Sequence, residues 1–383
     1  MSFPLIGDNR SFTEFCRKAS QQRLVAMDTE FVWVKTYYPI LGLVQLAWDA
    51  GHCVLVDPMA VSDTAAFGEL LANPDVCKVF HEASSDLPIL HRWCGALPRN
   101  VVDTRFAAGF CGLTAKLSLA KLMELMLDVH LAKTETRTDW TQRPLTSAQL
   151  EYAGDDVARL PELYQCLEGK IIGCGNLEFF KDEMSRYEQS AFFEEPKFRD
   201  VWMRVSRPAA RGLHWGPREL AILRELAAWR ERQARTQNIA KTRVCKDEWL
   251  VALAQRKPDS LEQVYSIPGI WSSVVRQSGM AMLQAVRQGQ NVPLSDCPRF
   301  PECHLDARLL RQRSDRLLAL VRKRAEARGI DPCLVCSRRE ADSLVCAASR
   351  TDSPSSPLLQ GWRHTLLAPA IDEICADFFA KHM

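Results

Sequence analysis

The first 170 residues alternate short apolar runs with helix-like stretches, and this alternation limits the possible folds more than any other feature of the chain. The run from Leu24 to Met27 ends at Asp28. Further apolar runs follow at 43–48, 53–56, 76–80 and 101–102. A turn sequence containing Gly51 separates the second run from the third, as is typical of a β-hairpin. Early hairpin strands with later strand–helix alternation predict an α/β domain with a mixed sheet.

The rest of the chain is predicted to be helical. Apolar residues recur at helical spacing among Arg and Glu after residue 211, and prolines mark a linker near residue 298. We therefore expect five segments: a first domain at 1–170, a connecting segment at 171–210, a helical domain at 211–290, a linker at 291–304 and a second helical domain at 305–383.

The net charge of +2 hides an asymmetry between the two halves. Residues 1–190 carry 18 Lys and Arg against 25 Asp and Glu, a balance of −7, and residues 191–383 carry 31 against 22, a balance of +9. This division indicates a catalytic or metal-binding part joined to a part that holds a polyanion. Alternatively, the difference between the two halves reflects only ordinary variation in surface charge.

Targeting and redox signals are also informative. The N-terminus has neither a basic start nor an apolar run, and no stretch approaches about 18 consecutive apolar residues, so neither a secretory signal nor a membrane span is expected. The fourteen cysteines are scattered through apolar segments, which is typical of reduced thiols in the cytoplasm. A zinc half-site at Cys333 and Cys336 is a weaker interpretation than buried thiols.

Carboxylates recur at three places in the first domain. On a strand, Asp28 and Glu30 would point the same way, which suits oxygen-seeking cations such as Mg²⁺ or Mn²⁺, although a solvated strand end would look alike. Asp86 stands where a strand passes into a helix, where its carboxylate could also simply favour the helix dipole. Tyr152 and Asp156 are one turn apart on a helix that a Thr-x-x-Gln capping box predicts to begin at residue 146.

Taken in order, these residues resemble the motifs of the DEDD exonuclease superfamily, tyrosine branch. The surrounding sequence resembles the ribonuclease D family over roughly residues 1–170, in Met27 to Phe31, Thr36 to Leu46, Val79 to Leu87, Val102 to Thr104 and Thr138 to Leu145. The resemblance implies a ribonuclease H-like exonuclease domain that hydrolyses RNA from the 3′ end and releases nucleoside 5′-monophosphates.

The resemblance also implies a role for each site residue. Asp28, Glu30 and Asp156 would hold one of two divalent ions, Mg²⁺ or Mn²⁺, with Asp28 bridging to the second, which Asp86 would orient through water. Tyr152 would aim the attacking water, because an unperturbed pKa of about 10 makes it a poor base. Asp155 is a rival ligand, and the i, i+4 spacing from Tyr152 favours Asp156.

The helical segments carry a second resemblance. Residues 219–270 are similar to the HRDC domain, and the last segment is similar to the more divergent second HRDC-type bundle of the family. Exposed Arg and Lys there could neutralise RNA phosphates, or the bundles could simply pack against the nuclease domain.

The expected function is 3′→5′ trimming of RNA, with tRNA precursors as substrates, by a monomer. A DNA exonuclease of the same superfamily and a catalytically silent nucleic-acid-binding protein remain as alternatives.

Overall fold

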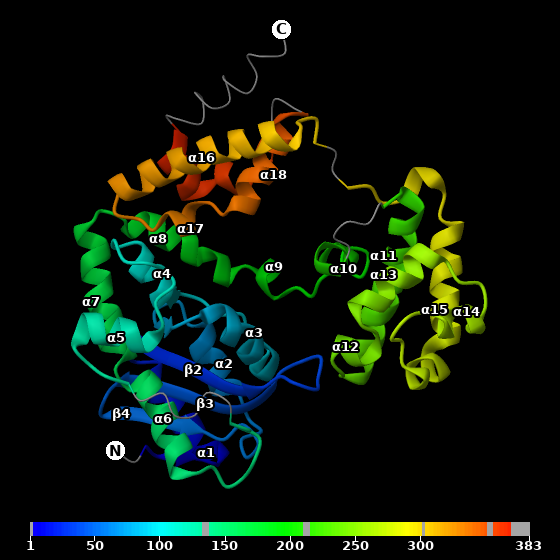
Figure 1. Ribbon diagram of the computed structural model, residues 1–383. Coiled ribbons are helices and arrows are strands. Elements are labelled where there is room, and N and C mark those ends of the chain that lie inside the picture. The colour runs from blue at the N-terminus through cyan, green and yellow to red at the C-terminus, as the bar shows by residue number, and fades with distance from the viewer. Residues whose placement is uncertain (1–2, 132–137, 210–214, 301–302, 351–354, 369–383) are drawn as a thin grey trace. The chain divides into compact units, whose positions relative to one another are not determined.

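The computed structural model describes residues 3–131, 138–209, 215–300, 303–350 and 355–368 (Figure 1). Its described residues divide into two compact units. Unit 1 comprises residues 1–31, 41–193 and 302–383, and unit 2 comprises 32–40 and 194–301. Among the described helices, none is long and apolar enough to cross a membrane.

A six-stranded sheet forms the centre of unit 1. The strands are β1 (Leu5–Ile6), β2 (Leu24–Val32), β3 (Ile40–Asp49), β4 (His52–Val56), β5 (Cys77–Phe80) and β6 (Val101–Asp103). They lie in the order β1-β4-β3-β2-β5-β6. The β3–β4 pair is antiparallel, while β1 pairs β4, and β5 pairs both β2 and β6, in parallel. The predicted mixed sheet and its hairpin are confirmed.

Helices surround this sheet. They are α1 (Asn9–Ala19), α2 (Ala65–Ala72), α3 (Ala83–Cys94), α4 (Thr104–Gly109), α5 (Leu119–Leu127), α6 (Ser147–Ala158) and α7 (Leu160–Gly173). Contacts join α6 to β4 and α7 to β5. Fully buried Met27, Leu46 and Phe80 contribute to the core from three different strands. The predicted capping box is present, since Thr146 and Gln149 each bond the other's backbone N–H at the start of α6.

The segment at 171–210, predicted as a connection, carries regular structure. It contains α8 (Leu177–Met184), the 3-10 turn η1 (Ser185–Glu188), α9 (Ser190–Phe193) and α10 (Trp202–Ala209). The division between the two units falls inside it, after residue 193. The predicted domain boundaries therefore stay predictions. Gly173 ends α7, whereas Pro196 lies between α9 and α10 and Pro208 lies within α10.

The carboxy-terminal helices belong to unit 1. They are α16 (Ala307–Ala327), α17 (Pro332–Val335), α18 (Arg338–Ala348) and the 3-10 turn η3 (Pro357–Leu359). Buried Glu183 on α8 joins them to the rest of unit 1, because it accepts hydrogen bonds from Arg363 Nη1 and Trp362 Nε1, both at 2.7 Å. Part of the Ser/Pro-rich stretch at 349–357 and the last fifteen residues lie outside the described ranges.

Unit 2 is a helical bundle with its own apolar core. After α10 it contains α11 (Pro217–Gln237), α12 (Lys241–Val244), α13 (Asp247–Arg256), α14 (Leu261–Tyr265), α15 (Ser272–Asn291) and the 3-10 turn η2 (Leu294–Asp296). Helices α11 and α15 pack closely, since a Cβ added to Gly289 would lie 2.4 Å from the Cα atom of Ile222. Buried Trp229 and Trp249 fill the centre of this bundle.

Candidate active site

The predicted carboxylates of the first strand lie inside β2 rather than at its end. β2 extends to Val32 and occupies the middle of the sheet, between β3 and β5. Its neighbour β5 pairs with Leu24–Ala26 and ends at Phe80. β2 therefore passes beyond the end of β5 soon after residue 26, and this places Asp28 and Glu30 beside a local gap in the sheet.

Asp86 lies next to this gap in the first turn of α3. Its buried carboxylate accepts a hydrogen bond from Thr29 Oγ1 at 2.5 Å and another from the Thr29 backbone. Asp103 at the end of β6 caps the start of α3, since its carboxylate accepts the backbone N–H of Ala83 at 3.0 Å. The end of one strand thus holds the helix that carries Asp86.

Tyr152 and Asp156 come from α6 and lie one turn apart, as predicted. The Tyr152 hydroxyl lies close enough to the Asp156 carboxylate for each group to shift the pKa of the other. Gly154, between them, packs against the ring of Phe3, where an added Cβ would come within 2.0 Å of a ring carbon. A larger residue at 154 would push α6 away, so this glycine lets the helix approach closely.

The four carboxylates influence one another's charge. Burial and the nearby charges of Asp86, Asp156 and Glu30 raise the pKa of Asp28 well above its ordinary value. Burial together with Asp156 and Asp86 raises the pKa of Glu30 to about 8. Burial raises the pKa of Asp86 to about 7 and that of Asp156 to about 6. The structure therefore brings Asp28, Glu30, Asp86 and Asp156 together around one place, although they are distant in sequence.

Asp155 behaves differently from its neighbour Asp156. Its pKa is raised by burial and by the charge of Glu151, and Asp28, Glu30 and Asp86 are not among the causes. Its charge instead affects the thiol of Cys53 on β4. Asp155 thus faces β4, while Asp156 faces the acidic group.

The donor set suits hard divalent cations, because it consists of carboxylate oxygens. Within the described ranges, no group of three or more His, Cys, Asp and Glu side chains has the geometry to hold a metal ion as it stands. A hydrogen bond from Thr29 engages Asp86, and the Tyr152 hydroxyl lies beside Asp156. Cation binding therefore requires a turn of these side chains, and the cation's charge would relieve the repulsion that raises their pKa values.

The side chain of Arg143 holds the segment before α6 in place, and the sequence patterns did not predict this role. Arg143 bonds both carboxylate oxygens of Asp57 at 2.7 Å, and it also donates to the backbone oxygens of Gly42 and Trp140. The Trp140 ring lies 6.3 Å from that of Tyr152. A Cβ at Gly42 would lie 2.5 Å from the Trp140 oxygen, so the glycine makes room for this arrangement.

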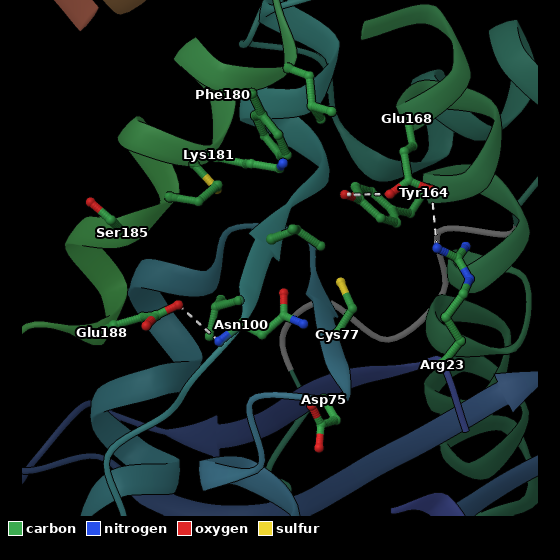
Figure 2. Close-up of a pocket in the computed structure, with 14 residues that line it drawn as sticks. Arg23, Asp75, Cys77, Asn100, Tyr164, Glu168, Phe180, Lys181, Ser185 and Glu188 are labelled. Atoms are coloured by element: carbon green, nitrogen blue, oxygen red, sulfur yellow. Dashed lines mark hydrogen bonds and ion pairs between the residues drawn. The ribbon is translucent and has the colours of Figure 1, made fainter. Parts of the chain in front are cut away.

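A cavity of about 400 Å³ lies elsewhere in unit 1 and is distinct from the acidic group (Figure 2). It lies where the chain enters β5 and β6, and none of the five predicted site residues lines it. Its polar groups bond one another, as in Arg23 with Glu168 at 3.2 Å and the Asn100 N–H with Glu188 at 2.8 Å. We interpret these pairs as structural.

Comparisons with known proteins identify the class of this fold and site. The family model described as 3′-5′ exonuclease matches residues 4–172, and the model described as HRDC domain matches residues 219–286. The chain is a 3′→5′ exonuclease that carries an HRDC domain.

Similar proteins define the family more narrowly. Ribonuclease D of Pseudomonas paraeruginosa is 32% identical over 96% of both chains, and that of Escherichia coli is 30% identical over 99% of this chain and 100% of its own. The crystal structure of Escherichia coli RNase D, described as an exoribonuclease involved in structured RNA processing, matches with a TM-score of 0.88 at 31% identity, covering 98% of this chain and 99% of that one. The chain belongs to the ribonuclease D family of 3′→5′ exoribonucleases.

Proposed function

We propose that Asp28, Glu30, Asp86 and Asp156 hold two divalent cations, Mg²⁺ or Mn²⁺, and that with Tyr152 they form the catalytic site for RNA hydrolysis. The single observation that carries this proposal is the convergence of four buried carboxylates, whose charges raise the pKa values of Asp28 and Glu30. Such mutual repulsion costs stability unless a cation offsets it, and strongly perturbed groups of this kind concentrate at functional sites.

When bound, the pair of cations supplies a water that is nucleophilic near neutral pH and neutralises the charge that develops on the leaving oxygen. The chain's own residues have positioning tasks. Asp28, whose pKa is raised by the charges of all three other acids, would contribute to holding both ions, with Glu30 and Asp156 completing one site and Asp86 helping to hold the other ion. These residues come from β2, α3 and α6, so the sheet and two helices fix their relative positions.

Tyr152 aims the attacking water. Burial and the charges of Asp156 and Glu30 raise its pKa above the ordinary tyrosine value, so the hydroxyl stays protonated at neutral pH. A protonated hydroxyl can donate to a carboxylate or orient a water, but it cannot remove a proton from one. The ring contact with Trp140 limits where this hydroxyl can point.

The substrates that we propose are RNAs with extra 3′ residues, tRNA precursors above all, trimmed by a monomer in the cytoplasm. The family resemblance supports the substrate class, and the similar Escherichia coli enzyme is described as acting in structured RNA processing. The thirteen described cysteines are free thiols, in keeping with a reducing compartment.

The test measures how fast the Asp28→Ala variant releases nucleotides from the 3′ end of an RNA oligonucleotide. A DNA oligonucleotide of the same sequence is measured in parallel. We expect loss of release with RNA binding kept. Glu14→Gln is the matched control, because it removes one carboxylate from an exposed ion pair with Lys18 on α1 and should trim at the normal rate. If Asp28→Ala still trims, the site is assigned wrongly.

A further inference from the structure

The outer face of α16 is strongly basic. We define this face by its exposed residues between 308 and 326, which are Arg308, Arg311, Gln312, Asp315, Arg316, Ala319, Arg322, Lys323 and Glu326. Five of the nine are cationic and two are acidic. At 100° per residue these positions fall on one side of the helix, so the cations form a stripe about 22 Å long.

The opposite side of α16 is buried, which fixes the rotation of the helix. Ser314, Leu317, Val321 and Ala325 are all buried there. Contacts from α16 run to α17 and α18, and Figure 1 shows α18 beside α16. The basic stripe is therefore turned away from the packed side.

Most cations of the stripe form no ion pair that would stabilise the fold, among the residues that the structure describes. No ion pair joins Arg308, Arg311, Arg322 or Lys323 to a carboxylate in the part of the chain that the structure describes. Asp315 instead pairs with Arg338 at the start of α18. Clustering exposed like charges destabilises a fold slightly, so internal stability does not explain this arrangement.

The composition of the stripe indicates the class of its partner. Ala319 is the one apolar residue of the nine. A helix that lies on a membrane needs large apolar side chains beside its cations, and an apolar protein interface needs them as well. Phosphates of a nucleic-acid backbone need cations alone.

The stripe is attached to the nuclease part of unit 1. Just beyond α16, Asp331 donates its N–H to the Gly109 oxygen and accepts the Ala115 N–H, both at 2.8 Å. Asn176 donates to the Arg328 oxygen at 3.0 Å. The helix thus belongs to the unit that contains most of residues 1–190 of the chain, and the balance of −7 over those residues would otherwise repel RNA.

We propose that the α16 outer face binds the phosphate backbone of the folded part of an RNA whose 3′ end is being trimmed. This inference rests on the proposed function, since it assigns to that activity a contact away from the carboxylates. The cations supply affinity without reading sequence. A short single-stranded substrate that fills only the acidic site has no use for the stripe.

The test uses the full chain carrying Arg308→Gln, Arg311→Gln, Arg322→Gln and Lys323→Gln together. The matched control removes four exposed cations elsewhere in unit 1 with Arg10→Gln, Arg17→Gln, Lys116→Gln and Lys170→Gln. Dissociation constants for a folded RNA with a 3′ extension are measured over a range of KCl concentrations, with EDTA present to prevent trimming. Thermal melting monitored by circular dichroism checks that both variants fold.

We expect the α16 variant to bind the folded RNA more weakly and to lower the slope of log Kd against log salt by about two to four, because fewer counterions are released. Both variants should trim a short single-stranded oligonucleotide at the normal rate. Equal slopes for the α16 variant and the unmodified chain overturn the proposal. So does a loss of binding to anionic lipid vesicles with RNA binding unchanged. An unmodified chain that trims neither RNA would refute the proposed function instead.

Discussion

Two buried acidic sites in this molecule have opposite surroundings. At the acidic group of unit 1, Asp28 has Glu30, Asp86 and Asp156 as its charged neighbours, and its pKa is raised. In unit 2, Glu231 is almost fully buried but bonds Arg235 and Lys241, each at 3.1 Å, and the Tyr37 hydroxyl. Burial alone would raise the pKa of Glu231, but Tyr37, Lys241 and Arg235 outweigh it and lower that pKa.

The difference separates the proposed functional site from a structural one. Cationic side chains of its own unit balance the charge of Glu231. Through these contacts Glu231 joins the 32–40 segment to α11 and α12. The four carboxylates of unit 1 lack such partners, so they destabilise the metal-free fold and are suited to hold an added cation. Burial of a carboxylate therefore does not indicate function by itself. The sign of the pKa shift is the more informative property.

The largest predicted effect is on the rate of RNA trimming, which should depend on the acidic group of unit 1 and not on Glu231. Glu30→Gln keeps the side-chain shape but removes a charged ligand, so we expect trimming to fall about a thousandfold, as a loss of several kcal/mol of transition-state stabilisation would cause. Glu231→Gln should leave the turnover of a short RNA unchanged. Single-turnover rates measure both, and similar rates for the two variants would remove the distinction.

Tyr152→Phe should reduce the rate on the order of a hundredfold, because the ring stays and only the aiming hydroxyl is lost. Tyr164→Phe is the matched control, since its hydroxyl bonds Glu168 in the separate cavity of Figure 2. We expect the control to trim normally. A Tyr152→Phe variant that trims at the same rate as the control would show that the hydroxyl is not needed to position water.

Glu231→Gln should lower the free energy of unfolding of the helical unit by about 2 kcal/mol, because it removes the counter-charge of Lys241 and leaves Arg235 with Glu195 alone. The pKa of Glu231 is lowered on folding, so its contribution exists above the unfolded pKa near 4.5 and is lost as the pH falls. Urea unfolding at pH 7 should therefore show the difference, and unfolding at low pH should not. A variant as stable as the unmodified chain at pH 7 would contradict this account.

Asp86→Asn should have the opposite and smallest effect, in protein stripped of metal. The pKa of Asp86 is raised to about 7, so ionising it costs stability as the pH rises from about 4 to 8. The asparagine variant should be more stable than the unmodified chain at pH 8, by a smaller amount at pH 5, and equally stable below about pH 4. Thermal melting with EDTA measures this. Lower stability at pH 8 would show that the carboxylate is already balanced by partners.

Local patterns in the sequence predicted much of the site. Alternation of side chains on a strand places Asp28 and Glu30 together, and the capping box at Thr146 fixes the start of α6 and hence the register of Tyr152 and Asp156. Both signals involve residues a few positions apart, so short-range geometry is sufficient to interpret them.

Contacts across long sequence separations could not be predicted in the same way. The hydrogen bond from Thr29 to Asp86 spans 57 positions, and that from Arg143 to Asp57 spans 86. Threonine is common in strands, so its sequence position gives no sign of such a role. The bond between Glu183 and Arg363 spans 180 positions and joins the last helices to the rest of unit 1, which composition alone does not reveal.

The most direct test of the central claim is a crystal structure of the chain with Mn²⁺ and a nucleoside 5′-monophosphate, using the anomalous signal of manganese. The account predicts two manganese peaks about 3.5–4 Å apart, contacted by Asp28, Glu30 and Asp156 and lying close to Asp86. Manganese bound elsewhere, or a nucleotide complex in which the four carboxylates contact no cation, would contradict it.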